Sequence, residues 1–181
     1  MNIWEESCGL EFIDSILKKK GLNPDNASLT DLASLDQLHS GGMGATRRLA
    51  DFARINSSHR VLDLGSGLGG VSRYLESRFK CRVGAVEKSS LLHDSATVLS
   101  RRLGSGVEHL QADIVEFQRP DSYERIIIQH VDMMVENKPS LYSNCRTNLT
   151  GDGFVIWHDW LAGFQGQIDY PVPWSSKGED S

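Results

Sequence analysis

The hydrophobic positions of the chain follow two patterns, and the change between them comes near residue 55. Over residues 5–20 apolar side chains recur every three or four positions, a spacing typical of one face of an amphipathic helix. That face consists of Leu10, Ile13, Ile16 and Leu17. Glutamates early in the segment and lysines late in it suit the helix dipole, and Gly21 is a suitable residue to follow the last turn.

Two shorter helices are predicted next. Ser28 and Asp31 have the spacing of a capping box, which predicts the start of a second helix. The glycine-rich stretch 41–44 then breaks the chain, and a third helix is predicted over 45–55. The side chains of this helix that we expect to face inward are Leu49 and Phe52.

From residue 60 onward, short apolar runs alternate with helical patterns. Strands are predicted over 60–64, 82–86, 107–111, 123–129 and 154–158, helices over 69–79, 89–103 and 138–149, and a turn at 151–153. Such near-continuous apolar strands indicate a parallel sheet covered on both faces. We therefore expect an α/β fold with a Rossmann-like, doubly wound, mostly parallel sheet over 56–181, and residues 1–55 as an N-terminal helical lid.

Length and composition fit this single domain. The 181 residues are 24% charged and 39% hydrophobic, and the net charge of −5 gives no electrostatic reason to expect nucleic acid as a partner. Three scattered cysteines without a C-x-x-C pair argue against a disulfide framework or a metal site. The sequence begins without the pattern of a signal peptide and contains no apolar run of roughly 18 residues, the length that a membrane span needs. These features predict a cytoplasmic location.

The richest chemical signal is the glycine cluster after the first predicted strand. In a doubly wound sheet the ligand lies beyond the carboxyl ends of the strands, and Gly65, Gly67 and Gly69 occupy the first such turn. The spacing of Gly65, Gly67 and Gly70 also satisfies the dinucleotide pattern G-x-G-x-x-G, which is weak alone. Asp63 separates the candidates, because a carboxylate at this turn repels a pyrophosphate but suits the ammonium and sulfonium cations of S-adenosylmethionine (AdoMet).

Two further acids follow the same geometry. Glu87 closes the second predicted strand, where a carboxylate can accept hydrogen bonds from ribose hydroxyls of either cofactor. Asp113 closes the third strand. Each acid alone is more often a turn or cap residue, but three acids at three successive strand ends favour an AdoMet pocket.

Several segments carry a family resemblance. The string VLDLGSG followed by LGG looks like motif I of the class I AdoMet-dependent methyltransferases. The segment LDQLHSGG with the following ATR, the QHV segment with its two methionines, and YPVPW at 170–174 resemble the sarcosine/dimethylglycine methyltransferase-like group of small-molecule methyltransferases. The resemblance runs from about residue 29 to 174 and leaves the substrate open.

This resemblance implies a role for each matching position. Gln37 and His39 would lie in a gating segment that closes over the methionine end of AdoMet, and Asp63 lies in the motif at that end. The other implied cofactor contacts are Gly65, Ser66 and Gly67 with the methionine portion, Glu87 with the ribose and Lys88 beside it, Asp113 and Ile114 with the adenine, and Gln129 with the amino-acid portion.

His130 would then face the methyl acceptor. A hydroxyl, phenol or enol acceptor needs a base, whereas a neutral amine needs only a site that keeps it unprotonated. His130 is our first candidate for that base and His39 and His158 are weaker ones; the alternative for His130 is a histidine that packs or hydrogen-bonds locally. Other candidates for the acceptor pocket are Asp159, Tyr170 and Trp174, which suit capping or packing equally well.

The expected function is methyl transfer from AdoMet to a small-molecule nitrogen or oxygen acceptor. One alternative keeps the AdoMet pocket without methyl transfer, as an accessory subunit or a cyclase-like relative. An NAD(P)-dependent oxidoreductase is disfavoured by Asp63, Asp113 and the helical lid. The related fold continues beyond the fifth strand, so we expect a chain truncated there, with an apolar edge strand. Three explanations are open: a fragment, a natural short form, or an edge that a homodimer or a partner chain covers.

Overall fold

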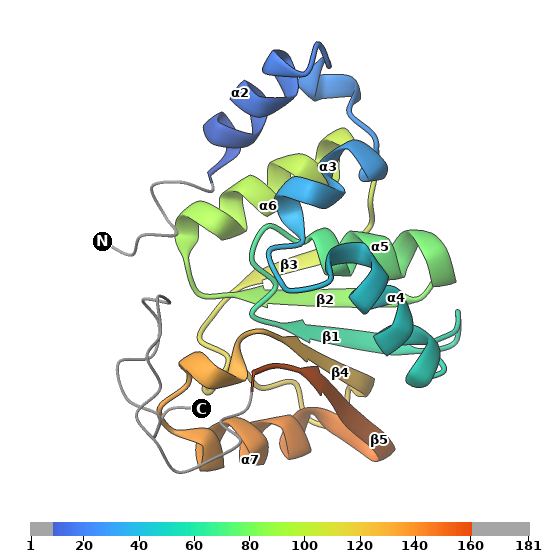
Figure 1. The fold of residues 1–181 in the computed structure, drawn as a ribbon. Coiled ribbons are helices and arrows are strands. Elements are labelled where there is room, and N and C mark those ends of the chain that lie inside the picture. The colour runs from blue at the N-terminus through green and yellow to red at the C-terminus, as the bar shows by residue number, and fades with distance from the viewer. Residues whose placement is uncertain (1–8, 161–181) are drawn as a thin grey trace.

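The computed structural model describes residues 9–160, and its centre is a five-stranded sheet in the order β3-β2-β1-β4-β5 (Figure 1). The strands are β1 (Arg60–Leu64), β2 (Arg82–Glu87), β3 (Glu108–Gln111), β4 (Tyr123–Gln129) and β5 (Leu149–His158). Every pair of neighbours is parallel. The expected doubly wound α/β fold is therefore confirmed, and the order of the strands turns at β1, between the neighbours β2 and β4.

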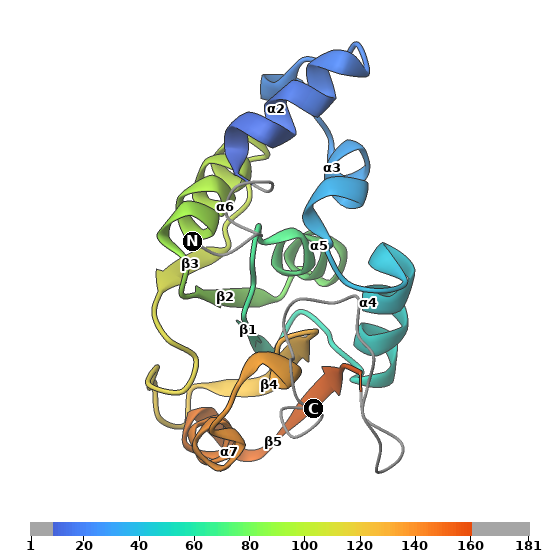
Figure 2. The ribbon, with the colours of Figure 1, turned by 60° about the vertical axis from the view of Figure 1, so that its left-hand side comes forward.

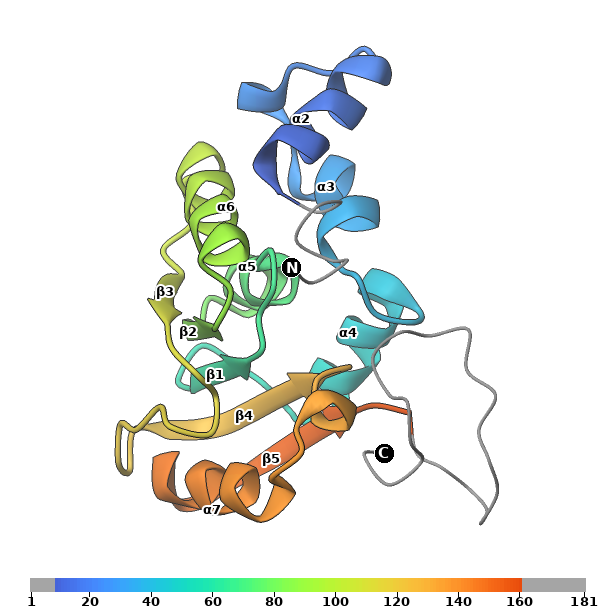
Figure 3. The ribbon, with the colours of Figure 1, turned by 90° about the vertical axis from the view of Figure 1, so that its left-hand side faces the viewer.

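Helices cover both faces of the sheet. On one face lie α4 (Gly42–Phe52), α5 (Gly70–Phe79) and α6 (Ser90–Arg102), and on the other lies α7 (Lys138–Asn148), as Figure 3 shows with the sheet between them. Alternate residues of one strand serve the two faces, so that Val61 packs in the cluster under α4 and α5 and Leu62 packs in the cluster under α7. Among residues 9–160 no helix is both long and apolar enough to cross a lipid bilayer.

The connection from β3 to β4 contains no helix, in agreement with the predicted elements. Residues 112–122 cross between parallel strands as a loop without a helix. Val115 and Phe117 of this loop pack in the α7-side cluster, and the side chain of Asn144 donates to the carbonyl oxygens of Ile114 and Phe117, both at 2.7 Å. The loop therefore covers the sheet in place of a helix.

The N-terminal helices stand on the edge of the molecule next to α5 and α6 (Figure 2). They are α2 (Leu10–Lys19), η1 (Pro24–Asn26) and α3 (Leu29–Asp36). The predicted capping box of Ser28 and Asp31 is present, and Gly21 follows α2 with a φ of +73°. The predicted first helix extended over 5–20; residues 5–8 of that prediction lie outside the described residues.

The third helix differs from its prediction. It begins at Gly42, inside the glycine stretch that we expected to break the chain, after Gly41 with a φ of +78°. Phe52, predicted to face inward, is 80% exposed, because the small side chains of Ala45 and Ala50 form the buried face instead. The expected Leu49 does pack partly against the core.

The last strand also differs. The predicted turn at 151–153 is wrong, because these residues lie inside β5. Tyr123 pairs with Leu149 and Arg125 with Phe154, so five steps along β5 match two along β4 and the surplus forms a bulge. In the described part of the chain β5 is an edge of the sheet, as predicted, with Phe154 and Trp157 exposed.

Candidate functional site

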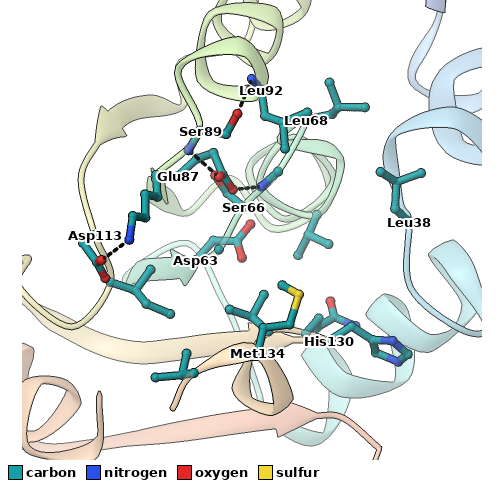
Figure 4. A pocket seen from close by; sticks show the side chains of 18 of the residues that line it. Leu38, Asp63, Ser66, Leu68, Glu87, Ser89, Leu92, Asp113, His130 and Met134 are labelled. Carbon is teal, nitrogen blue, oxygen red and sulfur yellow. Dashed lines mark hydrogen bonds and ion pairs between the residues drawn. The ribbon is translucent and has the colours of Figure 1, made fainter. Parts of the chain in front are cut away.

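A cavity of about 950 Å³ opens at the carboxyl ends of β1 to β4, beneath the segment that joins α3 to α4 (Figure 4). All but one of the residues predicted to contact the cofactor line it, and so does His130, the first candidate for the base. Those that do are His39, Asp63, Gly65, Ser66, Gly67, Glu87, Lys88, Asp113, Ile114, Gln129 and His130. Gln37 is buried behind the wall of the cavity and is not among the lining residues.

The glycines of the first turn all have left-handed backbone, but for different reasons. Gly65 has a φ of +74°, and a β-carbon there would collide with the side chain of Val131. A β-carbon on Gly69 would lie 2.8 Å from the guanidinium of Arg73. Only at Gly67, with a φ of +52°, would the added carbon meet no described atom within 4 Å. Gly67 is thus the glycine of these three that leaves room in the cavity itself.

Gly70 serves the contact between two helices. A β-carbon at this position would lie 2.5 Å from the backbone carbonyl oxygen of Asp36 in α3. The carboxylate of Asp36 in turn receives a hydrogen bond of 2.8 Å from the guanidinium of Arg73, which also donates to the carbonyl oxygen of Leu68 at 2.6 Å. The sequence suggested a ligand as the reason for the glycine cluster, and helix packing explains part of it.

Asp63 is a buried carboxylate in the cavity wall. Its side chain accepts a hydrogen bond of 2.5 Å from the hydroxyl of Ser72 in α5. Burial raises the pKa of Asp63 to about 6, the nearby Glu87 adds to the rise, and the Ser72 hydrogen bond opposes it. A cation in the cavity would stabilise the ionised form of Asp63, because its positive charge would replace the solvation that burial removes from the carboxylate.

Glu87 is held by backbone amides at the end of β2. One carboxylate oxygen accepts from the Gly67 amide at 2.9 Å and the other from the Ser89 amide at 2.8 Å. Each oxygen keeps a lone pair for a further donor. The carboxylate is therefore fixed between the glycine turn and the start of α6, with acceptor capacity left on both oxygens.

Asp113 follows β3 and forms an ion pair with Lys88. The ammonium lies 2.7 Å from one carboxylate oxygen, and the other oxygen accepts from the Val115 amide at 3.0 Å. The hydrogen bond from Lys88 lowers the pKa of Asp113 below its usual value, so the acid is ionised at neutral pH. The sequence assigned both residues to the site without predicting that they pair.

Residues 37–41, which join α3 to α4, form the lid segment over the cavity. Polar side chains form a cluster at this segment. The hydroxyl of Thr46 lies 2.9 Å from the side-chain oxygen of Gln37, 3.1 Å from Nε2 of His39 and 3.3 Å from the side-chain oxygen of Gln129. Since a hydroxyl donates one hydrogen bond at a time, these groups share it. Thr46 was not predicted as a site residue, although it lies in the ATR segment; its buried position on α4 is what gives it this role.

Three histidines meet beside the cavity. The ring centroids of His39 and His130 are 6.1 Å apart and those of His130 and His158 are 5.0 Å apart. His130 has a φ of +55°, its amide donates to the His158 carbonyl oxygen at 2.9 Å, and its Nε2 lies 3.0 Å from the hydroxyl of Ser40. Burial lowers the pKa of both His39 and His130, so these rings are neutral at pH 7.

The cluster does not have the form of a metal centre. Within residues 9–160 no group of three or more His, Cys, Asp or Glu side chains is arranged to hold a metal ion. Asp159 accepts from two backbone amides, that of Trp160 at 2.8 Å and that of Met133 at 3.4 Å. The remaining acceptor-site candidates, Tyr170 and Trp174, lie outside the described residues. The apolar residues after β4 that also line the cavity, none of them predicted, are Val131, Met133, Met134 and Val135.

Part of the sequence is similar to known proteins. The (S)-coclaurine N-methyltransferase of Thalictrum flavum subsp. glaucum is 33% identical over 106 residues, which are 58% of this chain and 29% of that protein. The phosphoethanolamine N-methyltransferase of Plasmodium falciparum (isolate 3D7) is 28% identical over 131 residues, which are 69% of this chain and 48% of that protein. The chain therefore spans less than half the length of these two relatives.

Solved structures share the fold. The phosphoethanolamine N-methyltransferase 2 of Haemonchus contortus, in complex with phosphomonomethylethanolamine and S-adenosylhomocysteine, matches 92% of this chain and 37% of its own chain with a TM-score of 0.69 at 19% identity. A family model described as a methyltransferase domain matches residues 61–153, just over half of the chain. Since that match runs from β1 into β5 and contains the glycine turn with the acids Asp63, Glu87 and Asp113, the chain belongs to the methyltransferase domain family.

Proposed function

We propose that the protein is an AdoMet-dependent methyltransferase that transfers a methyl group to a nitrogen atom of a small molecule. The observation that carries this proposal is the meeting of three carboxylates, Asp63, Glu87 and Asp113, around the glycine turn in one cavity. Figure 4 shows Asp63 and Glu87 at the middle of the cavity and Asp113 at one side. The names of the two curated relatives, both N-methyltransferases, favour nitrogen over oxygen as the acceptor.

The residues present fit AdoMet. Asp63 would face its ammonium group, Glu87 would accept from the ribose hydroxyls, and Asp113 would accept from the adenine amino group beside Ile114. The hydroxyl of Ser66 is buried in the cavity wall and has no hydrogen-bond partner within residues 9–160, so a polar ligand group would satisfy it. The cavity of about 950 Å³ also lies in the size range of small-molecule sites.

AdoMet supplies a methyl group that is already activated by its bond to a sulfonium sulfur. The protein then needs mainly to hold the acceptor in line with that methyl group and to keep it unprotonated. His130 is placed to do this, because it lines the cavity and its neutral imidazole can receive a proton. His39 and Gln37 belong to the lid segment that would exclude water above it.

Binding and turnover separate this proposal from its alternatives. Calorimetry should detect AdoMet and its product S-adenosylhomocysteine but not NAD; binding of NAD alone would support an oxidoreductase and reject the proposal. Turnover of AdoMet with a panel of amines, phenols and alcohols should show transfer to amines. A chain that binds AdoMet and methylates nothing in the panel would be the non-methylating relative.

We further propose that the protein is cytoplasmic and works as a homodimer, with residues 1–55 acting as the lid of the core at 56–181. The dimer proposal is supported by the edge position of β5, which exposes Trp157 at 51% and Phe154 at 40% in the described part of the chain. Light scattering tests it directly: a monodisperse monomer at micromolar concentration would contradict the homodimer.

A further inference from the structure

The cavity has two chemically different ends. At one end Lys88 and Asp113 form their ion pair, and on the other side of the cavity lie Leu38 and His130, with Met134 beside His130 (Figure 4). The adenine assignment places the first end with the cofactor. The second end is therefore the part of the cavity that remains for the methyl acceptor.

The acceptor end presents exposed apolar side chains. Leu38 in the lid segment is 46% exposed and Met134 after β4 is 49% exposed, and both line the cavity. Met133 and Val135 line the same region on either side of Met134. When an apolar ligand covers large apolar side chains in a cavity, apolar surface is removed from water and the free energy of the complex falls. These side chains suit an aryl or alkyl body on the acceptor.

The charges around the cavity point in the same direction. The carboxylates of the lining are Asp36, Asp63, Glu87, Asp113 and Glu136. Among the described lining residues the one lysine or arginine is Lys88, whose ammonium is held by Asp113 at 2.7 Å. Lys138, which is outside the lining, donates to the carbonyl oxygens of Asp132 and Val135. Among the described lining residues, the acceptor end therefore offers a phosphate dianion no arginine or lysine side chain, the groups that bind phosphate.

We propose that the acceptor is an amine with an apolar aryl or alkyl body and no phosphate group, which rests on the proposed function. The amine nitrogen uses its lone pair to form the new bond to the methyl carbon. The carbon–sulfur bond breaks with its electron pair left on sulfur, which yields S-adenosylhomocysteine. The methylated nitrogen is at first an ammonium. One of its N–H protons passes to the neutral imidazole of His130 and then to water, which leaves the neutral methylated amine.

The two curated relatives supply probes of opposite kinds. Calorimetry on the full chain saturated with S-adenosylhomocysteine measures the affinity for coclaurine, an amine with an aromatic body, and for phosphoethanolamine. We expect coclaurine to bind at least about tenfold more tightly, a factor that corresponds to one good apolar contact. With AdoMet in place of the product, methylation should follow the same order.

Variants of the two exposed side chains locate the contact. Leu38→Asn and Met134→Gln should each weaken coclaurine binding about tenfold and leave the affinity for S-adenosylhomocysteine unchanged. Phe52→Ser is the matched control, because Phe52 is 80% exposed on α4 and does not line the cavity. It should leave both affinities unchanged. Since all three side chains are exposed, these changes should not unfold the protein.

The outcomes separate this inference from the proposed function. If S-adenosylhomocysteine does not bind, the proposed function fails, and the acceptor proposal fails with it. If it binds and phosphoethanolamine binds more tightly than coclaurine, or neither amine binds, only the acceptor proposal is overturned. Equal losses in Leu38→Asn and Phe52→Ser would also overturn it, because the effect would not come from the cavity.

Discussion

The guanidinium of Arg73 lies 2.8 Å from the carboxylate of Asp36, and the two side chains are 0% and 2% exposed. Asp36 ends α3 and Arg73 lies in the first turns of α5, directly after the glycine turn. The guanidinium also donates to Leu68 in that turn and to the hydroxyl of Ser100 in α6. One buried ion pair therefore connects the lid, the glycine turn and the helix that follows β2.

Removing one partner of this pair should be costly. Asp36→Ala leaves the charge of Arg73 buried without its carboxylate, so we expect a loss of about 3–5 kcal/mol in the free energy of unfolding. Urea denaturation measures it. Asp14→Ala is the matched control, because Asp14 pairs with Arg102 at 2.7 Å but both side chains are 20% exposed. The control should lose about 1 kcal/mol. Equal losses in the free energy of unfolding of the two variants would show that burial of the Asp36–Arg73 pair does not increase the cost of breaking it.

Ligand binding should depend on the ionisation of Asp63. Burial raises its pKa from 3.8 to about 6, so the folded protein holds a proton there that the unfolded chain has already lost. The stability of the ligand-free protein should therefore fall as pH rises from about 4 to about 6. A bound ammonium prefers the carboxylate, so calorimetry with S-adenosylhomocysteine should show tight binding above pH 6 and a loss of about tenfold per pH unit below it.

Asp63→Asn is the control for this pH dependence. The amide keeps the shape and can still meet the hydroxyl of Ser72, but it carries no charge at any pH. Binding should be weak throughout and flat between pH 5 and pH 7. A variant that keeps the slope of the unmodified protein would show that another group carries the linked proton.

The glycines of the turn should divide into structural and binding positions. Gly65→Ala places a methyl group against Val131 at a positive φ, and it should lower the free energy of unfolding by more than about 2 kcal/mol. Gly67→Ala meets no described atom and should cost only about 1 kcal/mol for its φ. Its methyl group instead narrows the cavity, so S-adenosylhomocysteine should bind about tenfold less tightly. Thermal unfolding and calorimetry on both variants check this, and the reverse order of effects would contradict it.

His130 should affect the rate more than cofactor binding. His130→Asn removes the proton acceptor, and asparagine tolerates the φ of +55° that this position requires. We expect kcat to fall about 100-fold with little change in the affinity for S-adenosylhomocysteine. In the unmodified protein kcat should rise with pH to a plateau, and the midpoint of the rise should lie below pH 6.5 because burial lowers the pKa of this imidazole. An unchanged kcat in the variant would mean that water alone accepts the proton.

The elements that the sequence located best are those whose own residues determine them. β1 and β4 begin and end where predicted, because each is built around a short apolar run of its own, Val61-Leu62 in β1 and Ile126-Ile127-Ile128 in β4. The bulge in β5 was missed because it depends on the register against Tyr123, which lies on another strand. Phe52 was placed on the wrong face of its helix, since the small residues beside it pack more closely on the sheet.

The candidate site shows the same division. Local motifs identified Asp63, Glu87 and Asp113, and the parallel sheet brought them together as expected. What the motifs could not reveal are pairings between distant positions. The hydrogen bond of Thr46 with Gln129 and the ion pair of Arg73 with Asp36 join residues far apart in sequence. The first exists only once α4 has packed beside the end of β4, and the second only once α3 has packed on α5.

The lid segment is fastened unequally at its two ends. At Asp36 it is held by a buried pair of charges, and at Ser40 by an exposed hydrogen bond of 3.0 Å to His130. The weaker end should release first, so the segment would swing about Asp36 and open the cavity beside His130, on the side away from Asp113. Acceptor molecules could then exchange while the adenosine half of the cofactor remains seated, which is the arrangement that a tightly held nucleotide with a freely replaced second substrate requires.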